Sequence, residues 1–169
     1  MDSLGAVVVT GTTPSSFDAF FAAEYERLGR AMYLLTGDHA EAEDIAQEAM
    51  ARVYERWDRV RAVVSPTGYV YRVAINLCRR RSRRRPAIPG PSGTSPAIDP
   101  ASVVEDRDQI IRALRELTSE QREALVLVGW LDYDAETAGR ILGIDPASVR
   151  GRVHRARTAI RDRLGGDYG

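Results

Sequence analysis

Three clusters of charged side chains dominate the chemistry available to this chain, and their types suit binding rather than bond breaking. Between His39 and Asp58 there are six acids and two arginines. Between Tyr69 and Arg85 there are seven arginines and no acid, and between Arg140 and Arg163 there are seven arginines and two acids. The formal net charge is zero, so the total charge predicts no partner. Acidic and basic segments alternate along the chain, however, and this pattern predicts one partner for each sign of charge.

Residues suited to catalysis or metal binding are sparse. Cys78 is the only cysteine, which excludes an intrachain disulfide and a thiolate metal site. His39 and His154 lie far apart and lack ligand spacing, and no apolar run has the length of a membrane span. We therefore expect no catalytic residues, metal, cofactor, small-molecule substrate or membrane insertion, and a cytoplasmic location.

Helical periodicity with one strong break predicts an all-α fold of two small helical domains joined by a flexible linker. Residues 86–102 carry five prolines and two glycines, so they predict the linker, and residues 1–15 and 165–169 predict flexible tails. The domains would be residues 16–85 and 103–164, the second with a helix-turn-helix. The expected helices are residues 17–36, 40–57, 68–85, 104–117, 119–129, 135–142 and 146–164.

The helix expected at residues 40–57 has one acidic face opposite an apolar face, at 100° per residue. The acidic face comprises Glu41, Asp44, Gln47, Glu48 and Glu55. Such a cluster is more often a solvated helix face, and the alternative is a docking face for a basic protein partner. Charge alone also suggests that the free chain holds its two domains in a closed arrangement, with this face near the basic C-terminal helix.

The helix expected at residues 68–85 combines a core stripe with an arginine-rich face. Arg72, Asn76, Arg79 and Arg83 share that face, while Arg80 and its neighbours extend the charge. Arginines bind phosphates, an Asn amide can read a base edge, and an aromatic ring such as Tyr69 can stack on an unpaired base. Tyrosines in helices are more often core residues, which is the alternative to a stacking role.

The last two expected helices have helix-turn-helix spacing. Gly139 is small where the helices must approach, Gly143 permits the turn, and Asp145 and Pro146 suit the start of the final helix. The outward face of that helix would carry Ser148, Arg150, Gly151, His154 and Arg155. An outward N-terminal turn of this kind enters the DNA major groove in helix-turn-helix proteins.

Taken in order, these segments resemble the extracytoplasmic-function group of bacterial sigma factors. Residues 42–50, AEDIAQEAM, are similar to the acidic polymerase-docking motif of that family, and residues 69–80 to its promoter-melting helix. Residues 117–123 and 141–157 are similar to its C-terminal domain. The matches cover most of residues 17–164, and their order across a short linker makes the resemblance specific.

The resemblance implies a sigma subunit whose partners are core RNA polymerase, through the largest-subunit clamp helices and the flap, and promoter DNA. The docking residues would be Glu41, Asp44, Gln47 and Glu48. The −10 element would be bound by Tyr69, Arg72, Asn76, Arg79, Arg80 and Arg83, with residues 59–67 beside the base that Asn76 reads. The −35 element would face Ser148, Arg150, Gly151, His154 and Arg155. An anti-sigma protein is a further possible partner, which no residue decides.

Two alternatives remain at this point. A helix-turn-helix regulator that never docks on polymerase would use the C-terminal domain alone, but it leaves the acidic face and the first arginine cluster unexplained. A small nuclease ranks lower, because the sequence offers neither a metal cluster nor a nucleophile–base pair. Gly139 stands where the family more often has Ala, which predicts a slightly looser helix pair.

Overall fold

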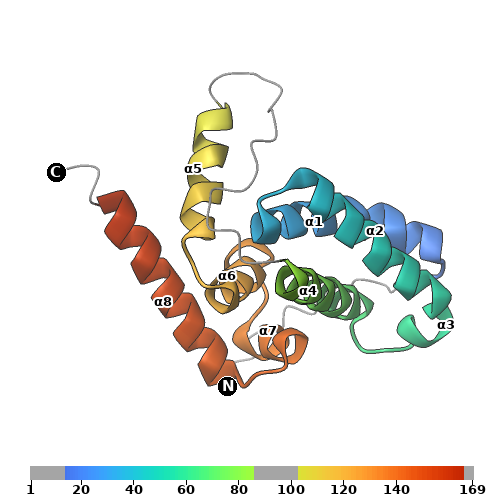
Figure 1. The fold of residues 1–169 in the computed structure, drawn as a ribbon. Helices are drawn as coiled ribbons and strands as arrows, with labels where there is room; N and C mark the ends of the chain where they lie inside the picture. The colour runs from blue at the N-terminus through green and yellow to red at the C-terminus, as the bar shows by residue number, and fades with distance from the viewer. Residues whose placement is uncertain (1–13, 86–102, 166–169) are drawn as a thin grey trace.

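The computed structural model describes residues 14–85 and 103–165, and every regular element within those ranges is helical (Figure 1). The all-α prediction is therefore confirmed for this part of the chain. The predicted linker at 86–102 and most of the two predicted tails lie outside the described residues. None of the described helices is long and apolar enough to cross a membrane.

The first half of the chain forms α1 (Phe17–Thr36), α2 (His39–Glu55), α3 (Trp57–Val60) and α4 (Pro66–Arg84). Side-chain caps set the start of each long helix, because the oxygens of Ser16, Asp38 and Ser65 accept from backbone N–H groups three residues on. Gly37 ends α1 in the left-handed conformation, at φ 69°. The helix predicted for 40–57 is shorter than expected, since α3 is a separate turn.

The second half forms α5 (Val103–Arg115), α6 (Ser119–Leu125), η1 (Val126–Trp130), α7 (Ala135–Leu142) and α8 (Pro146–Gly165). A capping box between Thr118 and Gln121 starts α6. The single helix predicted for 119–129 changes at Val126 into the π-helical turn η1, in which Leu131 N–H donates to the Val126 carbonyl at 2.9 Å. Widened turns of this kind are rare and often mark functional positions.

The two halves pack against each other and share one hydrophobic core (Figure 1). Helices α1 and α4 of the first half contact α5, α6, η1 and α7 of the second. The closeness suggested from charge alone is therefore present, but its surfaces differ from the expected ones. The acidic face of α2 is met by arginines of the adjacent α4 rather than by α8.

Candidate nucleic-acid and protein interfaces

The acidic face predicted on α2 divides into exposed and occupied groups. Asp44 has a side chain 67% exposed, and Gln47 and Glu55 are exposed as well. Glu41 is not outward-facing as expected, because its side chain is only 12% exposed and its Oε2 lies 2.9 Å from Arg85 Nη2. The outward part of this acidic face is therefore centred on Asp44 and Gln47.

Glu48 lies between two arginines. Its carboxylate accepts from Arg81 of α4 at 2.9 Å and from Arg52 on its own helix at 2.7 Å. The Arg81 hydrogen bond is the main cause that lowers the pKa of Glu48, with Arg52 adding to it against burial. Arg81 Nη1 also lies 3.9 Å from Asp44 Oδ2. The sequence indicated only that Arg81 adds positive charge to α4. Its pairing with the acids of α2 is visible only in the packing of the two helices.

The outer face of α4 is arranged largely as its periodicity predicts. Arg72, Asn76, Arg80 and Arg83 are exposed, and Tyr69 is half-buried. Tyr71 is a core residue with no exposed surface, in edge contact with Tyr133 of the second half. Its hydroxyl has no hydrogen-bond partner among residues 14–85 and 103–165, and burial raises its pKa well above the usual range. The face therefore presents an amide and three guanidinium groups to solvent.

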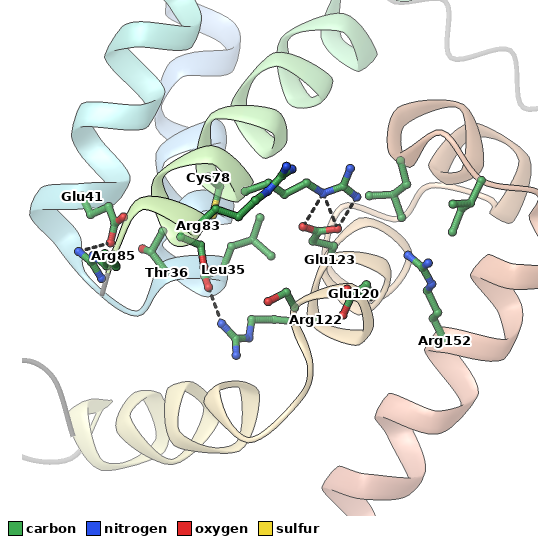
Figure 2. A pocket seen from close by; sticks show the side chains of 15 residues that line it. Leu35, Thr36, Glu41, Cys78, Arg83, Arg85, Glu120, Arg122, Glu123 and Arg152 are labelled. Atoms are coloured by element: carbon green, nitrogen blue, oxygen red, sulfur yellow. Dashed lines mark hydrogen bonds and ion pairs between the residues drawn. The ribbon is translucent and has the colours of Figure 1, made fainter. Parts of the chain in front are cut away.

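Arg79 departs from the predicted face. Its guanidinium pairs through two nitrogens with Glu123 of α6, at 2.9 Å from Nε to Oε1 and 2.6 Å from Nη2 to Oε2 (Figure 2). The Glu123 hydrogen bonds are the main cause that raises the pKa of Arg79. Sequence reasoning missed Glu123, although an acid among the apolar residues Ala124, Val126 and Leu127 signals a buried charge that needs a partner.

A cleft of about 650 Å³ lies between the halves beside this ion pair (Figure 2). Its walls come from α1, α2, α4, α6, α7 and α8, and they include Cys78, Arg83, Glu120 and Arg152. Burial raises the pKa of the Cys78 thiol to about 11, which keeps it protonated at neutral pH. Arg152 is thus turned toward the first half rather than toward the outward face of α8.

The helix-turn-helix geometry is confirmed at the residues that predicted it. Gly143 has φ 72°, and Asp145 caps α8 by accepting from Ser148 N–H at 2.8 Å. A Cβ added at Gly139 would lie 2.6 Å from the Ile144 carbonyl oxygen. The expectation that Gly139 loosens the pair is wrong, because only Gly permits this close approach.

The outward face of α8 carries Arg150, His154 and Arg155, all exposed. Ser148 is half-buried and its hydroxyl bonds to the Asp145 carboxylate, so part of its capacity is used by the cap. A Cβ at Gly151 would lie 3.4 Å from Arg155 Nη1, so the guanidinium lies along the bare backbone of Gly151. The arrangement presents cationic donors at the N-terminal half of the helix.

An apolar groove that sequence reasoning missed runs between α5, η1 and α8. Leu114, Leu125 and Ile160 line it, and the large side chains of Ile110 and Trp130 at its walls are 54% and 40% exposed. Exposed apolar surface gathered in a groove is typical of a protein-binding site.

Family models match both halves of the chain. The Sigma-70 region 2 model matches residues 20–87, and the Sigma-70 region 4 model matches residues 107–160. The chain is 30% identical over 152 residues to the ECF RNA polymerase sigma factor SigM of Mycobacterium tuberculosis, covering 89% of this chain and 78% of that protein. It is 28% identical to the RNA polymerase sigma-E factor of Streptomyces coelicolor, covering 88% of this chain and 85% of that protein.

A solved structure with a similar fold is the sigma factor RpoE of Bartonella quintana, determined in complex with the anti-sigma factor NepR. The TM-score is 0.73 at 25% identity, with 88% of this chain and 96% of that chain covered. The match spans both halves, so the arrangement of the halves is similar as well as each fold. CnrH in complex with the cytosolic domain of CnrY also matches, with a TM-score of 0.68 over 89% of this chain and 88% of that one, at 19% identity.

Proposed function

The chain belongs to the ECF sigma factors of bacterial RNA polymerase, and from that membership we propose a division of labour among its surfaces. The α2 surface binds core polymerase, α4 binds the −10 element, and α8 binds the −35 element. Residues 16–85 and 103–164 act as the two functional domains. The observation that carries this proposal is that an exposed acidic edge and two exposed arginine faces lie on three different helices.

Core docking is assigned to Asp44 and Gln47, with Glu48 beside them and Glu41 in a supporting role. An exposed carboxylate with one distant ion-pair partner is free to bind a basic clamp helix, whereas Glu41 is held by Arg85. The apolar groove at Trp130 is assigned to a second contact with the polymerase, at the flap. Polymerase therefore engages both halves of the chain.

The −10 element is assigned to the outer face of α4. Asn76 is exposed between arginines, so its amide can bond to an unpaired base while Arg72, Arg80 and Arg83 hold the backbone phosphates. Tyr69, on the same helix, is half-buried, so part of its side chain is open to a base. Residues 59–67, which include α3 and the turn before α4, would hold the base that Asn76 reads. Arg79 joins this set only when Glu123 releases it.

The −35 element is assigned to α8. Arg150, His154 and Arg155 face solvent from the first turns, which is the part of such a helix that enters the major groove. Ser148 and Gly151 complete the surface, the first through its hydroxyl and the second through close backbone approach. The role is one of binding with no covalent step, and it is carried out where the polymerase is, in the cytoplasm.

An anti-sigma protein is a further partner that we propose for this chain. The support is the structural similarity to RpoE, which was solved with NepR bound, and it extends over both halves. A partner of this kind would compete with polymerase for exposed surfaces such as the groove at Trp130.

The test is transcription in vitro with core polymerase of the source bacterium. Asp44→Ala is expected to weaken holoenzyme assembly at least about tenfold, whereas Glu136→Ala, which removes an exposed acid of α7, leaves assembly unchanged. Asn76→Ala is expected to spare assembly and to abolish preference for the native −10 base, with Ser82→Ala on the same helix as its control. Unchanged assembly with Asp44→Ala contradicts the docking assignment.

A further inference from the structure

The contact between Glu123 and Arg79 is the best-built ion pair between the halves. The Glu123 side chain is 6% exposed and that of Arg79 is 28% exposed, so both charges are largely withdrawn from water. The carboxylate meets the guanidinium through both of its oxygens (Figure 2). A paired fork of this kind matches the way in which an arginine binds a phosphate group.

Three more arginines tie the halves together by donating to backbone carbonyls across the contact. Arg122 Nη1 donates to the Leu35 carbonyl at 2.7 Å, and Arg115 Nη2 donates to the Gly37 carbonyl at 2.7 Å. Both acceptors lie at the C-terminal end of α1, where helix carbonyls lack partners and carry partial negative charge. In the opposite direction, Arg27 of α1 donates to the Leu131 carbonyl of the second half at 3.1 Å.

The closed arrangement is incompatible with binding both promoter elements. Helix α7 contacts both α4 and α8, so the axes of the two DNA-binding helices lie within roughly 20 Å, at about 10 Å per packed pair. The −10 and −35 elements lie about 25 base pairs apart, which is roughly 85 Å of duplex at about 3.4 Å per base pair. The 17 residues between Arg85 and Val103 can span about 60 Å when extended, so the chain allows the halves to separate.

We propose that Glu123 is an internal competitor of promoter phosphate for Arg79, and that this ion pair latches the free chain in a closed form. The inference rests on the proposed role of Arg79 in −10 binding. When the chain opens, a DNA phosphate replaces the Glu123 carboxylate on the Arg79 guanidinium, so the closed form lacks this −10 contact. The closed form also holds α8 too near α4 for both promoter elements to be bound at once. Engaging promoter DNA therefore requires the latch to break.

The experiment uses the full chain carrying Cys78→Ser, with donor and acceptor dyes on cysteines at the exposed positions Ala22 of α1 and Asp162 of α8. Energy transfer reports the separation of the halves, and binding of a single-stranded −10 oligonucleotide reports the freed Arg79. Glu123→Gln is expected to lower transfer and to tighten oligonucleotide binding about tenfold, the gain being limited by the closed-to-open ratio of the wild type.

The matched control is Glu120→Gln, on the same helix and beside the same cleft. It removes the same charge from an exposed side chain that forms no ion pair in the described part of the chain, so transfer and binding should not change. Unchanged transfer in Glu123→Gln overturns the latch. Lower transfer without tighter binding overturns the competition for Arg79, while the core-docking and −10 assignments are judged separately by the Asp44 and Asn76 variants.

A second variant tests the same ion pair in case Glu123→Gln fails to fold. The double variant Arg79→Glu with Glu123→Arg exchanges the two charges and keeps the pair. It is expected to restore high transfer while binding the oligonucleotide more weakly than the wild type, because position 79 then repels phosphate. An open double variant with intact helical content refutes the ion pair as the latch.

Discussion

Replacing Arg122 with Met is the perturbation whose magnitude follows most directly from the structure. The guanidinium donates to four backbone carbonyls: Leu114 at 2.7 Å, Leu35 at 2.7 Å, Leu117 at 3.0 Å and Arg115 at 3.2 Å. Three of these belong to the end of α5 and the loop that follows, and one belongs to α1. Burial lowers the pKa of Arg122, yet an arginine stays charged at neutral pH.

The loss expected for Arg122→Met is about 3 kcal/mol of unfolding free energy. A hydrogen bond from a charged donor contributes about 1.5–3 kcal/mol, so four of them contribute at least about 6 kcal/mol. We take half of this lower limit, because these carbonyls are only partly buried and water can replace the donor. For a chain of this size the loss lowers the melting temperature by roughly 6–12 °C. Met keeps the length and helix propensity of the side chain, so the change isolates the guanidinium.

The measurement is urea and thermal unfolding followed by circular dichroism at pH 7. Arg112→Met on α5 is the control, since it removes an exposed arginine that forms no hydrogen bond in the described ranges, and its effect should stay within about 0.5 kcal/mol. The loss of unfolding free energy in Arg122→Lys should lie between those of Arg112→Met and Arg122→Met, because one ammonium group cannot reach four carbonyls. A loss below about 1 kcal/mol in Arg122→Met refutes the reasoning that this side chain ties α1 to the second half.

Three further predictions concern packing, pH and coupling. Gly139→Ala should destabilise the chain by about 1–3 kcal/mol in urea unfolding, because the added Cβ would lie 2.6 Å from a backbone oxygen. Gly151→Ala is the control and should leave stability unchanged, because its Cβ meets only a movable side chain. A Gly139→Ala chain more stable than the wild type would contradict the close approach. The unfolding free energy of Tyr71→Phe should be within about 1 kcal/mol of the wild-type value at pH 7, because the hydroxyl has no partner in the described part of the chain. Burial raises the pKa of Tyr71 in the folded chain, so the wild type should lose stability as the pH rises above about 10, the pKa of an unfolded tyrosine. Tyr71→Phe should lose less stability over the same pH range in alkaline unfolding. Equal losses in the two chains would contradict the raised pKa of Tyr71. Arg81→Gln should strengthen binding of the chain to core polymerase about threefold in surface plasmon resonance, since it frees the acids of α2, and weaker binding would refute that.

Local sequence signals predicted the elements well. The cap at Asp145 and the turn at Gly143 are each decided by two or three neighbouring residues, so the residue types at those positions were enough. The π-helical turn at Val126 was not predictable, because it keeps the apolar spacing of an ordinary helix. Val126 and Leu127 of this turn are buried in the core that the two halves share.

The candidate surfaces were predicted less completely, for a single physical reason. Helical periodicity gives the direction of a side chain from its own axis but not what the next helix places against it. Periodicity assigned Glu41 and Arg79 to outward faces, but each is instead paired with a charge from another helix. Only tertiary contact could show that the predicted docking and DNA-binding surfaces are partly neutralised inside the chain.

These internal pairs connect the two kinds of partner. Under the proposed assignments, a basic clamp helix that binds Glu48 would displace Arg81, and a DNA phosphate at Arg81, which lies on the same helix as the −10 residues, would displace Glu48. Each partner therefore removes the internal competitor of the other, and thermodynamic linkage requires the two effects to be equal in size. The same argument holds for Arg85 with Glu41, where the carboxylate is the more buried member. If the proposed partner assignments hold, pairing acids and arginines within one chain should make the free protein bind either partner more weakly than it does in the assembled complex.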